Sequence, residues 1–220
     1  ASDVYKRQMG IPKEGKVIKN LGGPIDGQLV DVACKRPPFA TGRVGSSVKF
    51  EGPGVSPHVV AYNYPKAEGL LSVSAWVRAE SWPRWGCIAA NENKNVLGQF
   101  RLGFNRDSGR IKVRVRDDEN REVQLIDPEV LPLKEWQHIV FVADGKTLRL
   151  FRNGQEVAST ECGPISSPRN TSADQLFVGA QDNRDGKMIH FWHGRIDEIA
   201  LFNYPMTDDD VMKQYQSVSK

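Results

Sequence analysis

The sequence predicts an all-β protein, an antiparallel sandwich of two sheets, and three observations support this. Between residues 43 and 202, apolar and polar residues alternate in short runs, which is the period of half-buried strands. Turn-forming pairs such as Asp144-Gly145 and Asn153-Gly154 separate the runs. The composition, with 20 glycines, 13 prolines, 39% hydrophobic residues and no long apolar run, is typical of many short elements joined by turns.

Each predicted strand is a short alternating run bounded by turn residues. Residues 110–116 give the clearest example, because Ile111, Val113 and Val115 alternate with basic residues. The predicted strands span residues 43–50, 58–62, 70–77, 86–90, 99–104, 110–116, 121–126, 136–142, 147–151, 156–159, 176–179 and 191–202. A short helical turn should follow, since Thr207 precedes three aspartates in the pattern of a helix N-cap.

The length of 220 residues fits a single β domain, which we expect to span residues 9–220. Residues 1–8 resemble translated sequencing-adaptor read-through, found at the ends of reading frames assembled from environmental DNA. On that interpretation a covalently linked upstream domain and any signal peptide are missing. No window reaches the roughly 18 apolar residues of a membrane-spanning helix. The net charge of +3 is spread along the chain and does not favour nucleic acid.

The three cysteines, Cys34, Cys87 and Cys162, are too widely spaced for a disulfide framework or a structural zinc site. One disulfide with one free thiol and three free thiols are both compatible with the sequence.

Five ordered segments carry recognisable motifs. They are Gly-Ser-Ser-Val-Lys-Phe-Glu-Gly at residues 45–52, Ser-Val-Ser-Ala-Trp-Val-Arg at 72–78, Glu-Trp-Gln-His-Ile-Val-Phe-Val at 135–142, Leu-Arg-Leu-Phe-Arg-Asn-Gly-Gln-Glu-Val at 148–157 and Gly-Arg-Ile-Asp-Glu-Ile-Ala-Leu-Phe-Asn-Tyr at 194–204. Together they resemble the landmark strands of the laminin-G-like, concanavalin A-like lectin/glucanase family. The resemblance implies a jelly-roll sandwich in the extracellular space or cell envelope.

The resemblance also implies a function, for which three alternatives stay open. The first is a non-catalytic, lectin-like module of a larger secreted or envelope protein, which binds a neutral or anionic polysaccharide or glycoconjugate and has no catalytic residues. The second is a glycoside hydrolase or polysaccharide lyase with an atypical acid pair, although the chain lacks the Glu-x-Asp-x-x-Glu strand of laminarinase-type hydrolases. The third is a protein-interaction or structural domain, because fold does not fix function.

Three tryptophans are candidate ligand-binding residues. Trp82 and Trp85 lie in a predicted loop, and Trp192 lies on a later segment. Exposed tryptophans offer flat apolar faces that stack on sugar rings. Packing beneath the loop is the alternative.

A basic stripe is the second candidate for ligand binding. Lys112, Arg114 and Arg116 share one face of their predicted strand, and Arg101 alternates in the same way on the strand before it. If these strands are neighbours, the stripe suits sulfates or carboxylates. A solvated sheet face that prevents edge-to-edge association is the alternative.

Asp197 is predicted to share the apolar side of the last strand with Ile199 and Leu201. A carboxylate among core residues needs a partner, and a cation is one candidate. The family resemblance implies a structural calcium ion held by Asp197 and the backbone at Gly52. Hydrogen bonds from the backbone of a neighbouring loop are the alternative.

Overall fold

A computed structural model describes residues 38–54, 56–93, 96–167, 175–183 and 185–218, and the backbone pairing of three short strands before them. The elements in chain order are β1 (Tyr5–Lys6), β2 (Val17–Ile18), β3 (Gly27–Val30), β4 (Phe39–Thr41), β5 (Ser46–Glu51), β6 (His58–Ala61), β7 (Leu71–Ala79), β8 (Cys87–Asn93), β9 (Val96–Phe104), β10 (Arg110–Arg116), β11 (Glu122–Val130), β12 (Trp136–Ala143), β13 (Thr147–Arg152), β14 (Gln155–Glu161), β15 (Leu176–Val178), β16 (Gln181–Asp182), β17 (Met188–Ile189), β18 (His193–Phe202) and α1 (Asp208–Ser217).

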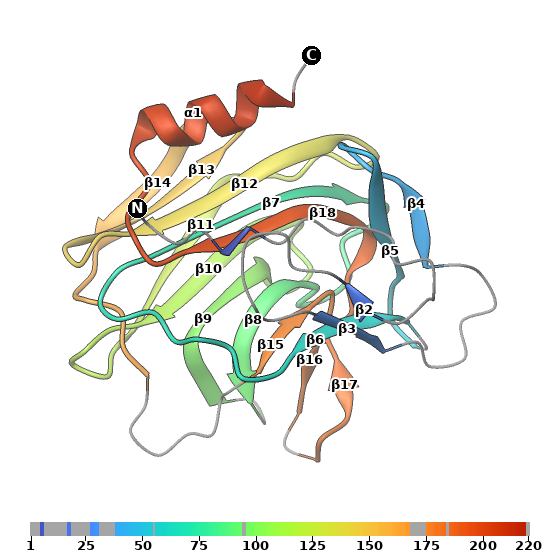
Figure 1. Ribbon diagram of the computed structural model, residues 1–220, viewed down its shortest axis with the longest axis horizontal. Coiled ribbons are helices and arrows are strands. Elements are labelled where there is room, and N and C mark those ends of the chain that lie inside the picture. The colour runs from blue at the N-terminus through green and yellow to red at the C-terminus, as the bar shows by residue number, and fades with distance from the viewer. Residues whose placement is uncertain are drawn as a thin grey trace.

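Two antiparallel sheets form the sandwich (Figure 1). The first sheet has the order β14-β13-β12-β7-β18-β5-β4, with β1 beside β18, and the second has the order β11-β10-β9-β8-β15-β6-β3-β2. The last strand therefore lies inside the first sheet, between β7 and β5. Non-sequential neighbours of this kind are expected for a jelly roll, and the predicted all-β sandwich is confirmed.

The core lies between the two sheets and is built from alternate residues of their strands. In β10, for example, Ile111, Val113 and Val115 are fully buried against the first sheet. Phe100 and Phe141 meet across the core with ring centroids 5.5 Å apart. The period-two patterns thus predict which face of each strand is buried.

Helix α1 covers the outer face of the first sheet (Figure 1). It buries Val211 in a second apolar cluster with Val140, Phe151 and Phe202. Its first turn is closed by a capping box, in which the Thr207 hydroxyl accepts a hydrogen bond from the N–H of Asp210 at 3.1 Å. The predicted helical turn is confirmed and extends to a ten-residue helix.

The last strand differs from its predicted geometry at a β-bulge. The register of β18 on β7 shifts between Asp197 and Ala200, and Glu198 has a left-handed φ of 46°. The extra residue reverses the alternation, so Ile199 faces the core while Asp197 faces outward beside Trp76. The prediction that Asp197 shares the apolar side with Ile199 and Leu201 was therefore wrong.

The described cysteines are free thiols within the core. Burial raises the pKa of Cys87 to about 12 and that of Cys162 to about 11, so both are protonated at neutral pH. Cys34 lies outside the described residues, as do most of residues 1–8, and the adaptor interpretation stays a prediction. In the part of the chain that the structure describes, no helix is long and apolar enough to cross a membrane.

Candidate functional site

Arg101 and Arg114 lie side by side on the outer face of the second sheet. The register pairs Arg114 of β10 directly with Arg101 of β9. Directly opposite residues of an antiparallel pair share a face, with Cβ atoms about 4.5–5.5 Å apart. The two strands are therefore neighbours, which is the condition for the basic stripe to form one surface.

Two carboxylates contact these arginines. Glu92 of β8 is buried, and its Oε2 lies 3.8 Å from Arg101 Nε and 3.3 Å from Arg114 Nη2. Glu122 of β11 lies 3.5 Å from Arg114 Nη1 and 2.7 Å from Nη2 of Arg116. Four cations therefore stand against two carboxylates on this surface, which retains positive charge. We call it the basic face, and its cations are Arg101, Lys112, Arg114 and Arg116.

Arg101 is fixed in place, whereas Arg114 is accessible. The Arg101 side chain is 4% exposed and donates from Nε to Gln181 Oε1 at 2.6 Å and from Nη2 to the carbonyl of Trp85. The Arg114 side chain is 27% exposed. The pair thus combines a preorganised guanidinium with one that solvent reaches.

Trp85 and His190 adopt strained backbone conformations beside this pair. Their φ angles are 60° and 55°, which bulky residues rarely adopt. The Trp85 N–H donates to the carbonyl of Arg106 at 2.8 Å, and the carbonyl of His190 accepts from the N–H of Cys87 at 2.8 Å. The two rings lie 6.3 Å apart at 51°. Strain that the surroundings hold in place is a common property of functional sites.

In addition to the effect of burial, the arginines of this face lower the pKa of two neighbouring basic groups. Burial, followed by Arg101, Arg114 and Arg84, lowers the pKa of His190 to about 4. The pKa of Lys112 is also lowered, first by burial and then by nearby arginines. Because cations repel one another here, the face favours an anionic ligand.

The three tryptophans lie in different environments. Trp85 is partly exposed at the basic face, with Lys112 Nζ 6.0 Å from its ring centroid. Trp82 is 39% exposed but packs against Gly109, and its Nε1 donates to the carbonyl of Leu131 at 3.0 Å. Trp192 is 0% exposed and stacks on Phe104 at 4.7 Å. The proposed contact of Trp192 with a ligand is therefore corrected, because no ligand reaches a ring in the core.

The side chain of Asp197 accepts hydrogen bonds from backbone N–H groups, which is the predicted alternative to a calcium ion. Its Oδ2 accepts the backbone N–H groups of Arg43 at 2.7 Å and Val44 at 2.9 Å, and its Oδ1 accepts that of Glu198 at 2.9 Å. The N–H of Gly52 instead donates to the carbonyl of Trp192. Trp192 precedes Asp197 by five residues, which is about 16 Å along an extended strand. Among the described residues, no acidic, histidine or cysteine group forms a metal-binding cluster.

These contacts do not fit the expected calcium site, because N–H donors already occupy both oxygens of Asp197. Calcium binding itself stays a prediction, and thermal unfolding tests it. A hydrogen-bonded Asp197 gives a melting temperature that millimolar calcium or a chelator leaves unchanged. A melting temperature that rises with calcium concentration would instead require a bound ion.

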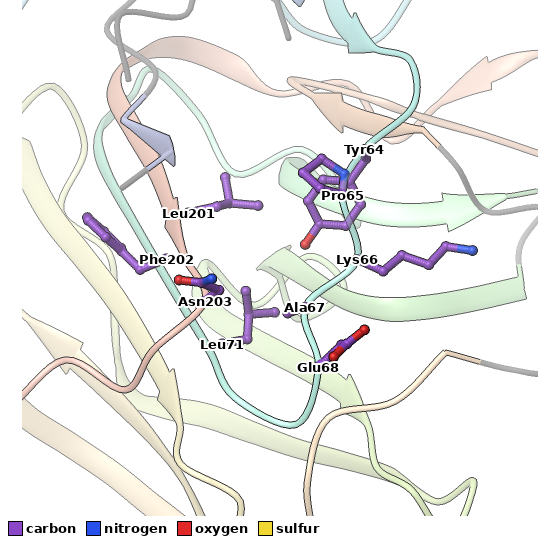
Figure 2. Close-up of a pocket in the computed structure, with 9 residues that line it drawn as sticks. All are labelled: Tyr64, Pro65, Lys66, Ala67, Glu68, Leu71, Leu201, Phe202 and Asn203. Atoms are coloured by element: carbon purple, nitrogen blue, oxygen red, sulfur yellow. The ribbon is translucent and has the colours of Figure 1, made fainter. Parts of the chain in front are cut away.

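A separate cavity of about 390 Å³ lies between the loop after β6 and the end of β18 (Figure 2). Tyr64, Leu71 and Leu201 form its apolar part, and Lys66 and Glu68 stand on its exposed side. Residues of the basic face do not line it. Because its charges have opposite signs, it does not select an anion or a cation as the basic face does.

Comparison with known proteins identifies the family. Residues 54–212 match a laminin G family model described as the concanavalin A-like lectin/glucanases superfamily. The chain belongs to this superfamily. The laminin-G-like resemblance of the sequence is thereby confirmed, and the superfamily fold places the basic face on one of its two sheets.

Sialidase B of Streptococcus pneumoniae serotype 4 is a curated relative of the chain. The match is 35% identical over 120 residues, and it spans 49% of this chain but 17% of the sialidase. The chain therefore corresponds to a small part of that enzyme.

Solved structures share the superfamily fold at low sequence identity. The binding domain of Paraclostridial Mosquitocidal Protein 1 has a TM-score of 0.69 and 14% identity, covering 98% of this chain and 52% of that one. Domain 4 of an extracellular arabinanase from Geobacillus stearothermophilus, in complex with arabinotriose, has a TM-score of 0.60 and 18% identity, covering 94% and 86%. The botulinum neurotoxin serotype D binding domain has a TM-score of 0.67 and 16% identity, covering 98% and 52%.

Three members of the basic face were not found from the sequence. Glu92 lies beyond the predicted strand at residues 86–90, in a part of β8 with irregular register. Gln181 lies in β16 and His190 directly follows β17, in a segment for which the sequence predicted no strand. The structure brings them to Arg101 through contacts between segments far apart in sequence, for which the sequence carries no local signal.

Proposed function

We propose that this chain is a non-catalytic carbohydrate-binding module that holds an acidic sugar by its carboxylate against Arg114, beside the buried guanidinium of Arg101. The cross-strand arginine pair on the outer face of the second sheet, with Arg114 accessible to solvent, carries the proposal. Planar guanidinium groups bind carboxylates through paired, charge-assisted hydrogen bonds. Arg101 is buried and held by Gln181 and the Trp85 carbonyl, so it adds a fixed positive charge beside the accessible Arg114.

Three comparisons support carbohydrate binding. The superfamily is described by its lectins and glucanases, and the arabinanase domain was solved with an oligosaccharide. The curated relative is named a sialidase, a class of enzyme that acts on sialic acid, a sugar with a carboxylate. We therefore propose a sialylated glycan as the first ligand to test, and an extracellular parent protein that the module tethers to it.

The carboxylates at this face favour binding over hydrolysis. A glycosidase needs an acid that stays protonated until it reaches its substrate. Glu92 and Glu122 both form ion pairs with Arg114. We propose that they orient its guanidinium rather than act as the acid and base of a hydrolase.

Replacing Arg114 by alanine tests the proposal. We expect affinity for sialyllactose to fall about ten- to hundredfold, because hydrogen bonds to charged groups contribute about 1.5–3 kcal/mol. Titration calorimetry measures this, with lactose as the neutral ligand that should not bind. Arg110→Ala is the matched control, since it removes the same charge from an exposed position about 13 Å away on β10.

Other results would contradict the proposal. If acidic sugars do not bind, or if Arg110→Ala weakens binding as much as Arg114→Ala, the arginine pair is not a specific site. Release of reducing sugar from a glycan panel would instead favour a hydrolase. A decrease in affinity with rising salt is expected for the proposed ion pairs.

A further inference from the structure

We infer that Trp85 forms a second subsite, which binds the neutral hexopyranose attached to the acidic sugar. The ligand of the basic face would then be an acidic sugar in glycosidic linkage rather than a free sugar acid. This inference rests on the proposed function, because it assumes that Arg114, beside Arg101, holds the acidic sugar.

The first argument is position. The carbonyl of Trp85 accepts a hydrogen bond from Arg101 Nη2, so this residue borders the arginine pair. Its ring centroid lies 6.0 Å from Lys112 Nζ, and Lys112 is two residues from Arg114, about 7 Å along β10. A ligand whose carboxylate lies at the arginines therefore reaches Trp85 with its next sugar.

The second argument is that only loosely placed side chains cover the indole ring of Trp85. Arg106 Cζ and Lys112 Nζ lie over it at 5.9 and 6.0 Å, near the outer limit of cation–π attraction. Neither cation is packed tightly onto the ring, and both belong to flexible side chains that a ligand can displace. The apolar face of a pyranose can then stack on the indole.

The third argument is rigidity. Both peptide groups of Trp85 are held, the N–H by the Arg106 carbonyl and the carbonyl by Arg101, in a left-handed conformation that tryptophan rarely adopts. His190, in the same rare conformation, stands beside the ring at 51°. The platform is thus ordered before a ligand arrives, which lowers the entropy cost of binding.

Trp82 provides a natural comparison on the same loop. Its side chain is more exposed, but it packs on Gly109 and bonds to the carbonyl of Leu131, whereas Trp85 bonds to Arg101. Exposure alone would select Trp82 as the sugar platform. Proximity to the charged site selects Trp85.

The experiment compares two ligands, 3′-sialyllactose and the methyl glycoside of N-acetylneuraminic acid, which lacks the second sugar. We expect the native protein to bind the trisaccharide about tenfold more tightly. Trp85→Ala should remove this difference, because the second sugar then has no aromatic face on which to stack. Trp82→Ala, the matched control, should leave both affinities unchanged, and Trp85→Phe should keep most of the difference because it retains an aromatic face.

The possible results separate the two proposals. Equal affinity of the native protein for both ligands, or loss of the difference in Trp82→Ala, overturns the second subsite while the arginine site stands. Absence of binding by either ligand overturns both proposals together. The indole N–H resonance of Trp85 gives an independent reading, since it should shift strongly with the trisaccharide and weakly with the methyl glycoside.

Discussion

Replacement of Trp192 by alanine is expected to lower the free energy of unfolding by about 3–5 kcal/mol, the range for removing a large aromatic side chain from a core. Trp192 is fully buried and stacks on Phe104, with ring centroids 4.7 Å apart and an interplanar angle of 16°. The cavity left behind cannot collapse easily, because the backbone on both sides is tied down by bonds to Gly179 and Gly52. Denaturant unfolding measures the loss.

Trp82→Ala is the control for this experiment. Because Trp82 is 39% exposed, its loss should cost about 1 kcal/mol, mainly through its hydrogen bond to Leu131. Comparable stability of the Trp192 and Trp82 variants would contradict the assignment of Trp192 to the core. The folded Trp192 variant should still bind glycan, since Trp192 does not line the basic face.

Trp192 also illustrates what a sequence can predict. The alternation in β10 is local, so it correctly assigned Lys112, Arg114 and Arg116 to one face and their apolar neighbours to the other. Trp192 precedes β18 between two histidines, and nothing local distinguishes a buried tryptophan there from an exposed one. Its burial comes from Phe104 in the opposite sheet.

The bulge in β18 shows a second kind of limit. Period-two reasoning assigns sides correctly until one extra residue enters a strand, after which every later assignment reverses. Glu198, with its φ of 46°, is that residue, and it turned Asp197 away from the core. Glutamate at this position carries no signature of a left-handed conformation, since glycine and asparagine are the residues that usually mark one.

Stability is expected to fall in acid through His138. Burial lowers the pKa of its imidazole from the ordinary 6.5 to about 4. The ring lies on the outer face of the first sheet, 5.1 Å from Trp76 and 6.2 Å from Tyr215 of α1, where a charge would lose its hydration. The neutral ring is therefore part of the packing that holds the helix on the sheet.

The sign of the effect follows from proton linkage. The unfolded chain binds a proton at His138 below its ordinary pKa of 6.5, whereas the folded protein resists protonation until about 4. The contribution is fully present above pH 6.5, is lost progressively as the pH falls to about 4, and then levels off. The pKa difference corresponds to about 3 kcal/mol.

Denaturant unfolding of native protein and His138→Gln across this pH range tests the linkage. The stability difference between the two should shrink as the pH falls, because glutamine does not titrate, and a constant difference would contradict the assignment. His190→Gln is the matched control, since burial and the nearby arginines also lower the pKa of His190 to about 4. His190 lies at the basic face, away from α1, so its replacement should remove a separate contribution of the same sign and leave that of His138 unchanged.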